Sequence, residues 1–121
     1  MNEWRVNFHS EFISEFRDLP LAVRERLGAL VKLLQGAGPQ LARPMADTLS
    51  GSKHANMKEL RFDSGNGVWR VAYAFDPVRE AILLVAGDKS GISQKRFYKS
   101  LIAKADTRFD RHLLTLKPRG H

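Results

Sequence analysis

The chain has 121 residues, 43% of them hydrophobic, and this predicts one compact domain with a single core over residues 1–121. Because no apolar run is long enough to span a membrane and the start of the chain lacks a secretory pattern, we expect a soluble, cytoplasmic protein. The absence of cysteine excludes disulfide bonds and thiolate metal sites, and the spacing of the four histidines does not favour zinc, so no metal or cofactor is expected.

The net charge of +7 is concentrated near the C-terminus. Residues 95–121 contain eight Lys or Arg and two Asp, whereas residues 1–94 contain twelve basic and eleven acidic side chains. This asymmetry indicates either a polyanion or acidic protein as partner, or a helix face that is merely solvated.

Residues 4–39 predict a short strand followed by a helical hairpin. Hydrophobic and polar side chains alternate over residues 4–8, as in a strand with one apolar face. Ser10 is a candidate cap for a first helix, and Pro20 separates it from a second, which ends near residues 36–39. The second helix carries an apolar stripe made of Val23, Leu27, Leu30, Val31 and Leu34.

Three strands and a last helix are predicted in the second half of the chain. Residues 40–56 lack a sustained period and are expected to form a loop. The strands are "MKELRFD", "VWRVAYAF" and "EAILLVAGD", joined by hairpin turns, and helical spacing then continues from about Tyr98 to near Pro118. The class is therefore α+β: a twisted, mainly antiparallel sheet of about four strands, with the N-terminal helical hairpin and the C-terminal helix. We expect the helices to pack on the sheet face that carries Trp69, Val71, Tyr73 and Phe75.

Arg70 then lies on the opposite face, and two hairpin registers are possible around it. A two-residue turn at residues 66–67 places Asp63 opposite Arg70, which would form a structural ion pair. A four-residue loop over residues 64–67 instead places Arg61 opposite Arg70, which costs stability unless an anion lies between them. The Asn-Gly pair slightly favours the first register. In both, Arg61 and Arg70 project from the same face.

Two guanidinium groups on one face suit a phosphate, because each presents a fork of donors. Lys89 follows the last strand, and Lys95, Arg96 and Tyr98 begin the last helix, so these groups could surround a nucleic-acid backbone. Tyr98 also continues the apolar stripe of its helix and could simply pack there.

The chain resembles the RelE/HigB-like toxins of bacterial and phage toxin-antitoxin modules, in particular the phage-derived HigB-like branch. The resemblance rests on a KELR strand, a WR strand ending in FDP, a GDK loop and an RFY helix start, in this order. It implies a RelE-like domain that cuts messenger RNA, typically on the translating ribosome, as an mRNA interferase, and we expect this cleavage to need no metal. It also implies a helix-turn-helix, HigA-like antitoxin as partner. Alternatives are a ParE-like gyrase inhibitor on the same fold and a non-catalytic nucleic-acid-binding module.

The resemblance implies catalytic roles for four residues: Arg61, Arg70, Lys89 and Tyr98. The expected RNA-binding residues are Lys58, Lys95, Arg96 and Lys99. Other basic residues of the last helix are expected outside its apolar stripe, facing ribosomal RNA or the antitoxin: Lys104, Arg108 and Arg111.

The general base is left open by the sequence. Better-known RelE members carry lysines where this chain has Met57 and Glu59, and some HigB relatives use a histidine, for which His54 is a candidate. Tyr98 and Lys89 are the other candidates, and we expect neighbouring cations to lower the pKa of whichever group serves. The cut codons and the oligomeric state are not predicted by these residues.

Overall fold

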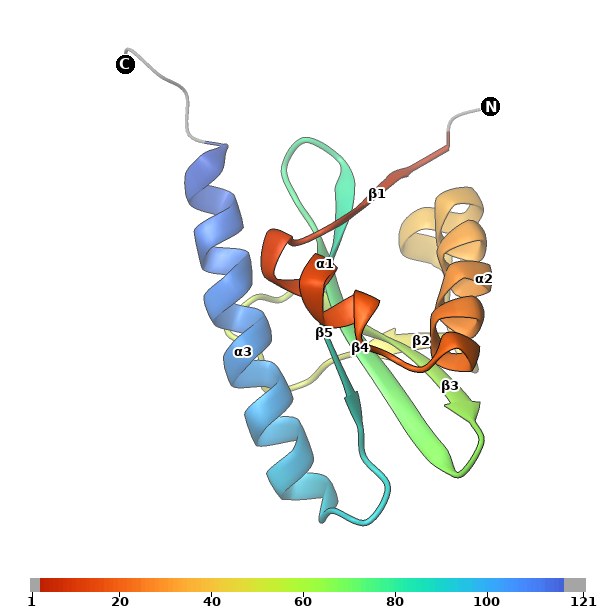
Figure 1. Cartoon of the computed structure of the whole chain (residues 1–121). Helices are drawn as coiled ribbons and strands as arrows, with labels where there is room; N and C mark the ends of the chain where they lie inside the picture. Colours follow the sequence, from red (N-terminus) through yellow and green to blue (C-terminus); the bar gives the residue numbers. More distant parts are fainter. Residues whose placement is uncertain (1–2, 117–121) are drawn as a thin grey trace.

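The computed structural model describes residues 3–116, which form a five-stranded sheet with helices on both faces (Figure 1). The elements follow in this order: β1 (Arg5–Phe8), α1 (Ser10–Arg17), α2 (Leu21–Ala37), the 3₁₀ turn η1 (Gly38–Gln40), β2 (Ala46–Thr48), β3 (Met57–Ser64), β4 (Gly67–Phe75), β5 (Glu80–Asp88) and α3 (Gln94–Thr115). None of the helices in this part of the chain is both long and apolar enough to cross a membrane.

The sheet has the strand order β1-β5-β4-β3-β2. The three strands expected to form an antiparallel meander do so, and β1 pairs in parallel with β5 at one edge. The other edge is β2, which pairs with Lys58–Leu60 of β3 inside the segment predicted to be loop. Three residues are too few for alternation to reveal a strand, so the sequence does not predict β2. The α+β class is confirmed.

The helices occupy both faces of the sheet, and this corrects the expectation that all of them share one face. On the aromatic face, Val71 and Tyr73 of β4 pack against Phe12 of α1 and Leu27 and Leu34 of α2. On the opposite face, α3 forms a second core, in which it contributes Phe97, Leu101, Ala105 and Phe109. The figure shows the sheet lying between α3 and α2 (Figure 1).

Small side chains on β4 explain the place of α3. Ala72 and Ala74 leave room above the strand, and β5 is apolar on both faces, with Ile82 and Leu84 turned toward α3. The helix starts at Gln94 because Ser93 caps it, its side chain accepting the Arg96 N–H at 3.2 Å.

The β3–β4 hairpin adopts the register in which Arg61 is opposite Arg70, so the register favoured from the sequence is wrong. Ser64 pairs with Gly67, and the two turn residues between them begin with Gly65, whose φ is 58°. Glycine adopts this positive φ at no steric cost, so Gly65 can occupy the first position of the two-residue turn. The turn is therefore formed by residues 65–66 and not by the Asn-Gly pair at residues 66–67.

Arg108 is buried, although it was expected on the solvent side of the last helix; its residue exposure is 6%. A register shift leaves Leu84 as an extra residue of β5, between partners of Ala72 and Tyr73, and Arg108 donates to its carbonyl at 2.7 Å. The same guanidinium binds both carboxylate oxygens of Glu15, at 2.8 and 2.5 Å, and thereby joins α3 to α1. The helical pattern of α3 cannot indicate that the Leu84 carbonyl, on another element, needs a hydrogen-bond donor, so the burial of Arg108 could not be predicted from that pattern.

Candidate functional site

The structure brings together the four side chains predicted to be catalytic. Arg61 and Arg70 are directly opposite each other on β3 and β4, on the face covered by α3. Tyr98 lies in the first turns of α3 and its hydroxyl is 3.3 Å from Arg70 Nε. Lys89 follows β5, held by a backbone bond of 2.8 Å to the Val68 carbonyl, and its Nζ is 6.0 Å from the centroid of the Tyr98 ring.

Glu59 lies at the centre of this cluster and was not among the predicted site residues. Its Oε1 accepts the Tyr98 hydroxyl at 2.8 Å, and its Oε2 accepts Arg61 Nη1 at 2.8 Å. Arg70 Nε is 3.9 Å from Oε1. The anion needed between two opposed arginines is therefore supplied by the protein itself, two residues before Arg61 on the same strand face.

The cluster shifts the proton affinities of two of its members in opposite directions. Burial, together with the hydrogen bond and charge of Glu59, raises the pKa of Tyr98 against the opposing effect of Arg70. Burial and the charges of Arg70 and Arg61 lower the pKa of Lys89. The expectation of a lowered pKa is confirmed for the lysine and wrong for the tyrosine. Tyr98 is thus suited to donate a hydrogen bond, and Lys89 to release a proton.

A hollow of about 550 Å³ opens beside the cluster; we call it the site hollow. Glu59, Arg61 and Tyr98 line one side of it, and Lys95 lies on the rim. β2 forms the opposite side, where Asp47 accepts a 2.8 Å bond from Arg43 Nε. Although Glu59 is only 3% exposed, its carboxylate borders a space large enough to admit part of a ligand.

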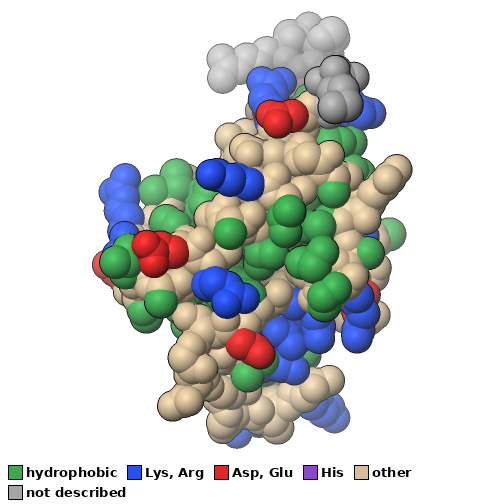
Figure 2. All heavy atoms as spheres, turned by 90° about the vertical axis from the view of Figure 1, so that its right-hand side faces the viewer, with side chains coloured by type: hydrophobic (Ala, Val, Ile, Leu, Met, Phe, Trp, Pro, Cys, Tyr) green, Lys and Arg blue, Asp and Glu red, His purple; other side chains and the backbone are tan. Residues whose placement is uncertain are grey.

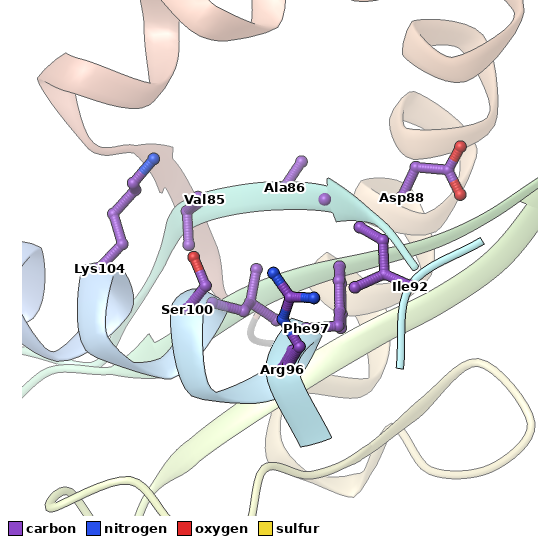
Figure 3. A pocket seen from close by; sticks show the side chains of 10 residues that line it. Val85, Ala86, Asp88, Ile92, Arg96, Phe97, Ser100 and Lys104 are labelled. Carbon is purple, nitrogen blue, oxygen red and sulfur yellow. The ribbon is translucent and has the colours of Figure 1, made fainter. Parts of the chain in front are cut away.

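The remaining predicted RNA-binding residues lie outside the site hollow. Lys58 is opposite Tyr73 on the aromatic face of the sheet. Lys99 is exposed on α3. Arg96 lines a different hollow of about 370 Å³ between α3 and β5, where it shares one side of the helix with Lys104 (Figure 3). Of these four residues, only Lys95 reaches the cluster's hollow.

His54 is held far from the cluster. Its Nε2 is 2.8 Å from Asp110 Oδ1, and its ring meets that of Phe109 edge-on. Asp110 lies twelve residues after Tyr98 on α3, about 18 Å along the helix axis. Residues 3–116 contain no group of three or more histidine, aspartate and glutamate side chains that could hold a metal ion.

The fold is that of the RelE toxins. The chain superposes on an E. coli toxin RelE variant in the free state with a TM-score of 0.60 and 16% identity, over 84% of this chain and 96% of RelE. It superposes on the archaeal RelE–RelB complex from Pyrococcus horikoshii OT3 with a TM-score of 0.54 and 18% identity, over 74% of this chain and 98% of that chain.

The family described as "Phage derived protein Gp49-like" matches residues 14–110, and the chain belongs to this family. Two similar proteins come from Mycobacterium tuberculosis H37Rv. "Putative toxin HigB2" is 44% identical over 90 residues, which are 74% of this chain but only 44% of HigB2. "Putative toxin HigB3" is 46% identical over 83 residues, which are 69% of this chain and 70% of HigB3. The match therefore spans less than half of HigB2.

Proposed function

We propose that this protein is the toxin of a toxin-antitoxin system and acts as a ribosome-dependent mRNA endoribonuclease. The RelE fold and the similarity to HigB2 and HigB3 support the class of protein. The observation that carries the chemistry is the contact of one carboxylate, Glu59, with Arg61 and Tyr98 at the border of an open hollow.

Cleavage in this proposal proceeds by attack of the ribose 2′-OH on the adjacent phosphorus. The reaction needs a base for the 2′-OH, cations for the charge that develops on phosphorus, and an acid for the leaving 5′-oxygen. Arg61 and Arg70 supply the cations. Lys89 is the acid, because its lowered pKa eases release of its proton.

Glu59 is the base in this proposal, in preference to Tyr98 and His54. A carboxylate can accept a proton at neutral pH, whereas the raised pKa of Tyr98 keeps the phenol protonated. His54 is engaged with Asp110 at a distant part of α3. Tyr98 then orients the carboxylate through its 2.8 Å hydrogen bond and contacts the nucleotide bound in the site hollow.

The partners proposed are messenger RNA on the ribosome and a helix-turn-helix, HigA-like antitoxin. The proposed location of all of them is the cytoplasm. The archaeal RelE structure is a complex with RelB, which supports an antitoxin as partner. The exposed cations Lys95, Lys99 and Lys104 on α3 provide a positively charged surface for ribosomal RNA or for an acidic antitoxin.

Inducing the protein in a bacterial host and mapping new 5′ ends in translated messages tests this function. We expect growth arrest with cuts inside coding regions. Growth arrest with altered DNA supercoiling and no new ends would indicate a gyrase inhibitor. The absence of both new ends and altered supercoiling would indicate a non-catalytic binding module.

A further inference from the structure

A second hollow, of about 690 Å³, adjoins the candidate site at the outer edge of β3; we call it the edge hollow. Its walls come from α2, from the segment before β2 and from the β3–β4 hairpin, including Arg26, Pro44, Met45, Arg61, Asp63 and Arg70. Arg61 lines both the edge hollow and the site hollow. A flexible polymer that crosses Arg61 would therefore contact both hollows.

The edge of β3 is open where it borders this hollow. β2 covers β3 only along Lys58–Leu60, and the Arg61 N–H then donates to the Met45 carbonyl at 2.8 Å. Backbone groups two residues apart on a strand point to the same edge, so the N–H and C=O of Asp63 also point outward. Within residues 3–116, no strand pairs with this part of the edge.

The charges around the edge hollow match a nucleotide. Arg26, Arg61 and Arg70 contribute three guanidinium groups, which suit phosphate oxygens. Asp63 and Arg26 are exposed, and neither forms an ion pair within the described part of the chain. In the view onto α2, basic side chains gather beside an acidic one in the lower part of this face (Figure 2).

Asp63 gives the hollow a means of distinguishing bases. An ionised carboxylate accepts hydrogen bonds but donates none, so it pairs with bases that present an exocyclic amino group, as adenine, cytosine and guanine do. Single-stranded RNA exposes these edges to side chains and to backbone groups. Uracil has no amino group, and its one ring donor, N3–H, lies between two carbonyl oxygens that repel a carboxylate, so it pairs less well with such a site.

We propose that the edge hollow binds the nucleotide next to the scissile phosphate, with Arg26 on its outer phosphate and Asp63 on its base. This inference rests on the proposed function for the identity of the ligand as RNA. It adds a positioning residue and a specificity-determining residue that lie outside the catalytic cluster. The open edge Phe62–Ser64 offers few backbone groups to a partner strand, whereas three guanidinium groups line the hollow beside it, which favours a nucleotide over a peptide.

Fluorescence anisotropy with short 2′-O-methylated RNAs tests the inference on the intact wild-type chain. These probes lack the attacking hydroxyl, so binding is measured without cleavage. Arg26→Ala should weaken binding about tenfold, as expected for the loss of a charged hydrogen bond. It should also reduce the slope of log Kd against log salt by about 0.7. Lys32→Ala, on the exposed side of the same helix, is the matched control and should change neither.

Asp63→Asn is measured on homopolymers of adenosine, cytidine and uridine. Wild type should bind the first two more tightly than uridine, and the variant should lose this preference while retaining its fold by circular dichroism. Equal affinities for Arg26→Ala and Lys32→Ala, an unchanged base preference in Asp63→Asn, or no binding by wild type would each overturn the inference. Binding as predicted by a protein that cuts no message would refute the nuclease and leave the nucleotide site standing.

Discussion

Arg70 and Arg108 are two arginines with equal burial and different surroundings. Both side chains are 7% exposed, and both lie between the sheet and α3. Arg108 has three short hydrogen bonds, two to Glu15 and one to the Leu84 carbonyl. Arg70 has one short bond, to the Trp69 carbonyl, and a long one to Tyr98, and it faces another arginine.

The difference teaches that the number of hydrogen-bonded donors, rather than burial, distinguishes the arginine that we propose to be functional from the structural one. A guanidinium has five N–H donors, and burying them without acceptors costs free energy. The acceptors of Glu15 and Leu84 offset this cost for Arg108. Arg70 has N–H donors without an acceptor within residues 3–116, and Arg70 and Arg61 both border the edge hollow. A phosphate bound there would supply the missing acceptors.

The largest effect is expected from Glu59, compared with Glu15, the partner of Arg108. Glu59→Gln removes the proposed base while keeping the shape of the side chain, so the cleavage rate should fall about 10²- to 10⁴-fold. Glu15→Gln should leave the rate of the folded protein unchanged. Single-turnover cleavage of a ribosome-bound message measures both, and equal rates in the two variants would mean that Glu59 only neutralises its arginines.

Arg70→Ala should lower the cleavage rate by about 10²-fold or more, because a donor to the developing phosphorane charge is lost. Growth arrest should disappear, and the fold should survive because the change also removes a like-charge contact with Arg61. Thermal unfolding checks the fold of the same preparation. Full toxicity in this variant would exclude Arg70 from the mechanism.

Arg108→Ala should change stability instead of chemistry. It leaves the buried Leu84 carbonyl without its donor, and the free energy of unfolding should fall by about 2–3 kcal/mol. The hydrogen bond from Arg108 holds the pKa of Glu15 below its ordinary value of 4.5. This contribution is present above pH 4.5 and is lost as the pH falls through the lowered pKa. The difference in the free energy of unfolding between wild type and variant, measured by denaturant titration, should therefore become smaller in acid. Equal free energies of unfolding at neutral pH would contradict the structural role of Arg108.

The smallest effect is expected at Tyr73, in the core on the other face. Its hydroxyl is buried and has no hydrogen-bond partner within residues 3–116, and burial raises its pKa. Tyr73→Phe removes a polar group without a partner, so the free energy of unfolding should stay equal or rise by up to about 1 kcal/mol. A loss of stability in chemical denaturation would show that the hydroxyl contributes to the fold.

The helices and the strands β1, β3, β4 and β5 could be predicted because their apolar periods are strong, whereas the three-residue strand β2 could not. The same alternation placed Arg61 and Arg70 on one face, and the order of motifs identified Lys89 and Tyr98 beside them. The same alternation also places Glu59 beside the two arginines, since it is two residues before Arg61 and shares its face. The resemblance to RelE predicts a lysine at this position, whereas the negative charge of Glu59 is what the opposed arginines require.

The features that could not be predicted from the sequence depend on contacts between segments that are distant along the chain. The side on which α3 packs follows from the space above Ala72 and Ala74, and alternation alone does not measure that space. The role of Arg108 depends on an extra residue in β5 and on a glutamate 93 residues away. The hairpin register was decided by Gly65, because two overlapping turn signals compete within four residues.

The chemistry of the RNA ends tests the central claim most directly: that the Glu59 cluster promotes attack by the 2′-OH. A ribosome-bound message cut by the wild-type protein in the presence of a chelator should carry 2′,3′-cyclic phosphate and 5′-hydroxyl ends. A single 2′-deoxy nucleotide at the cut site should abolish cleavage there. Ends with a 3′-hydroxyl and a 5′-phosphate, or undiminished cutting at the deoxy position, would contradict the account.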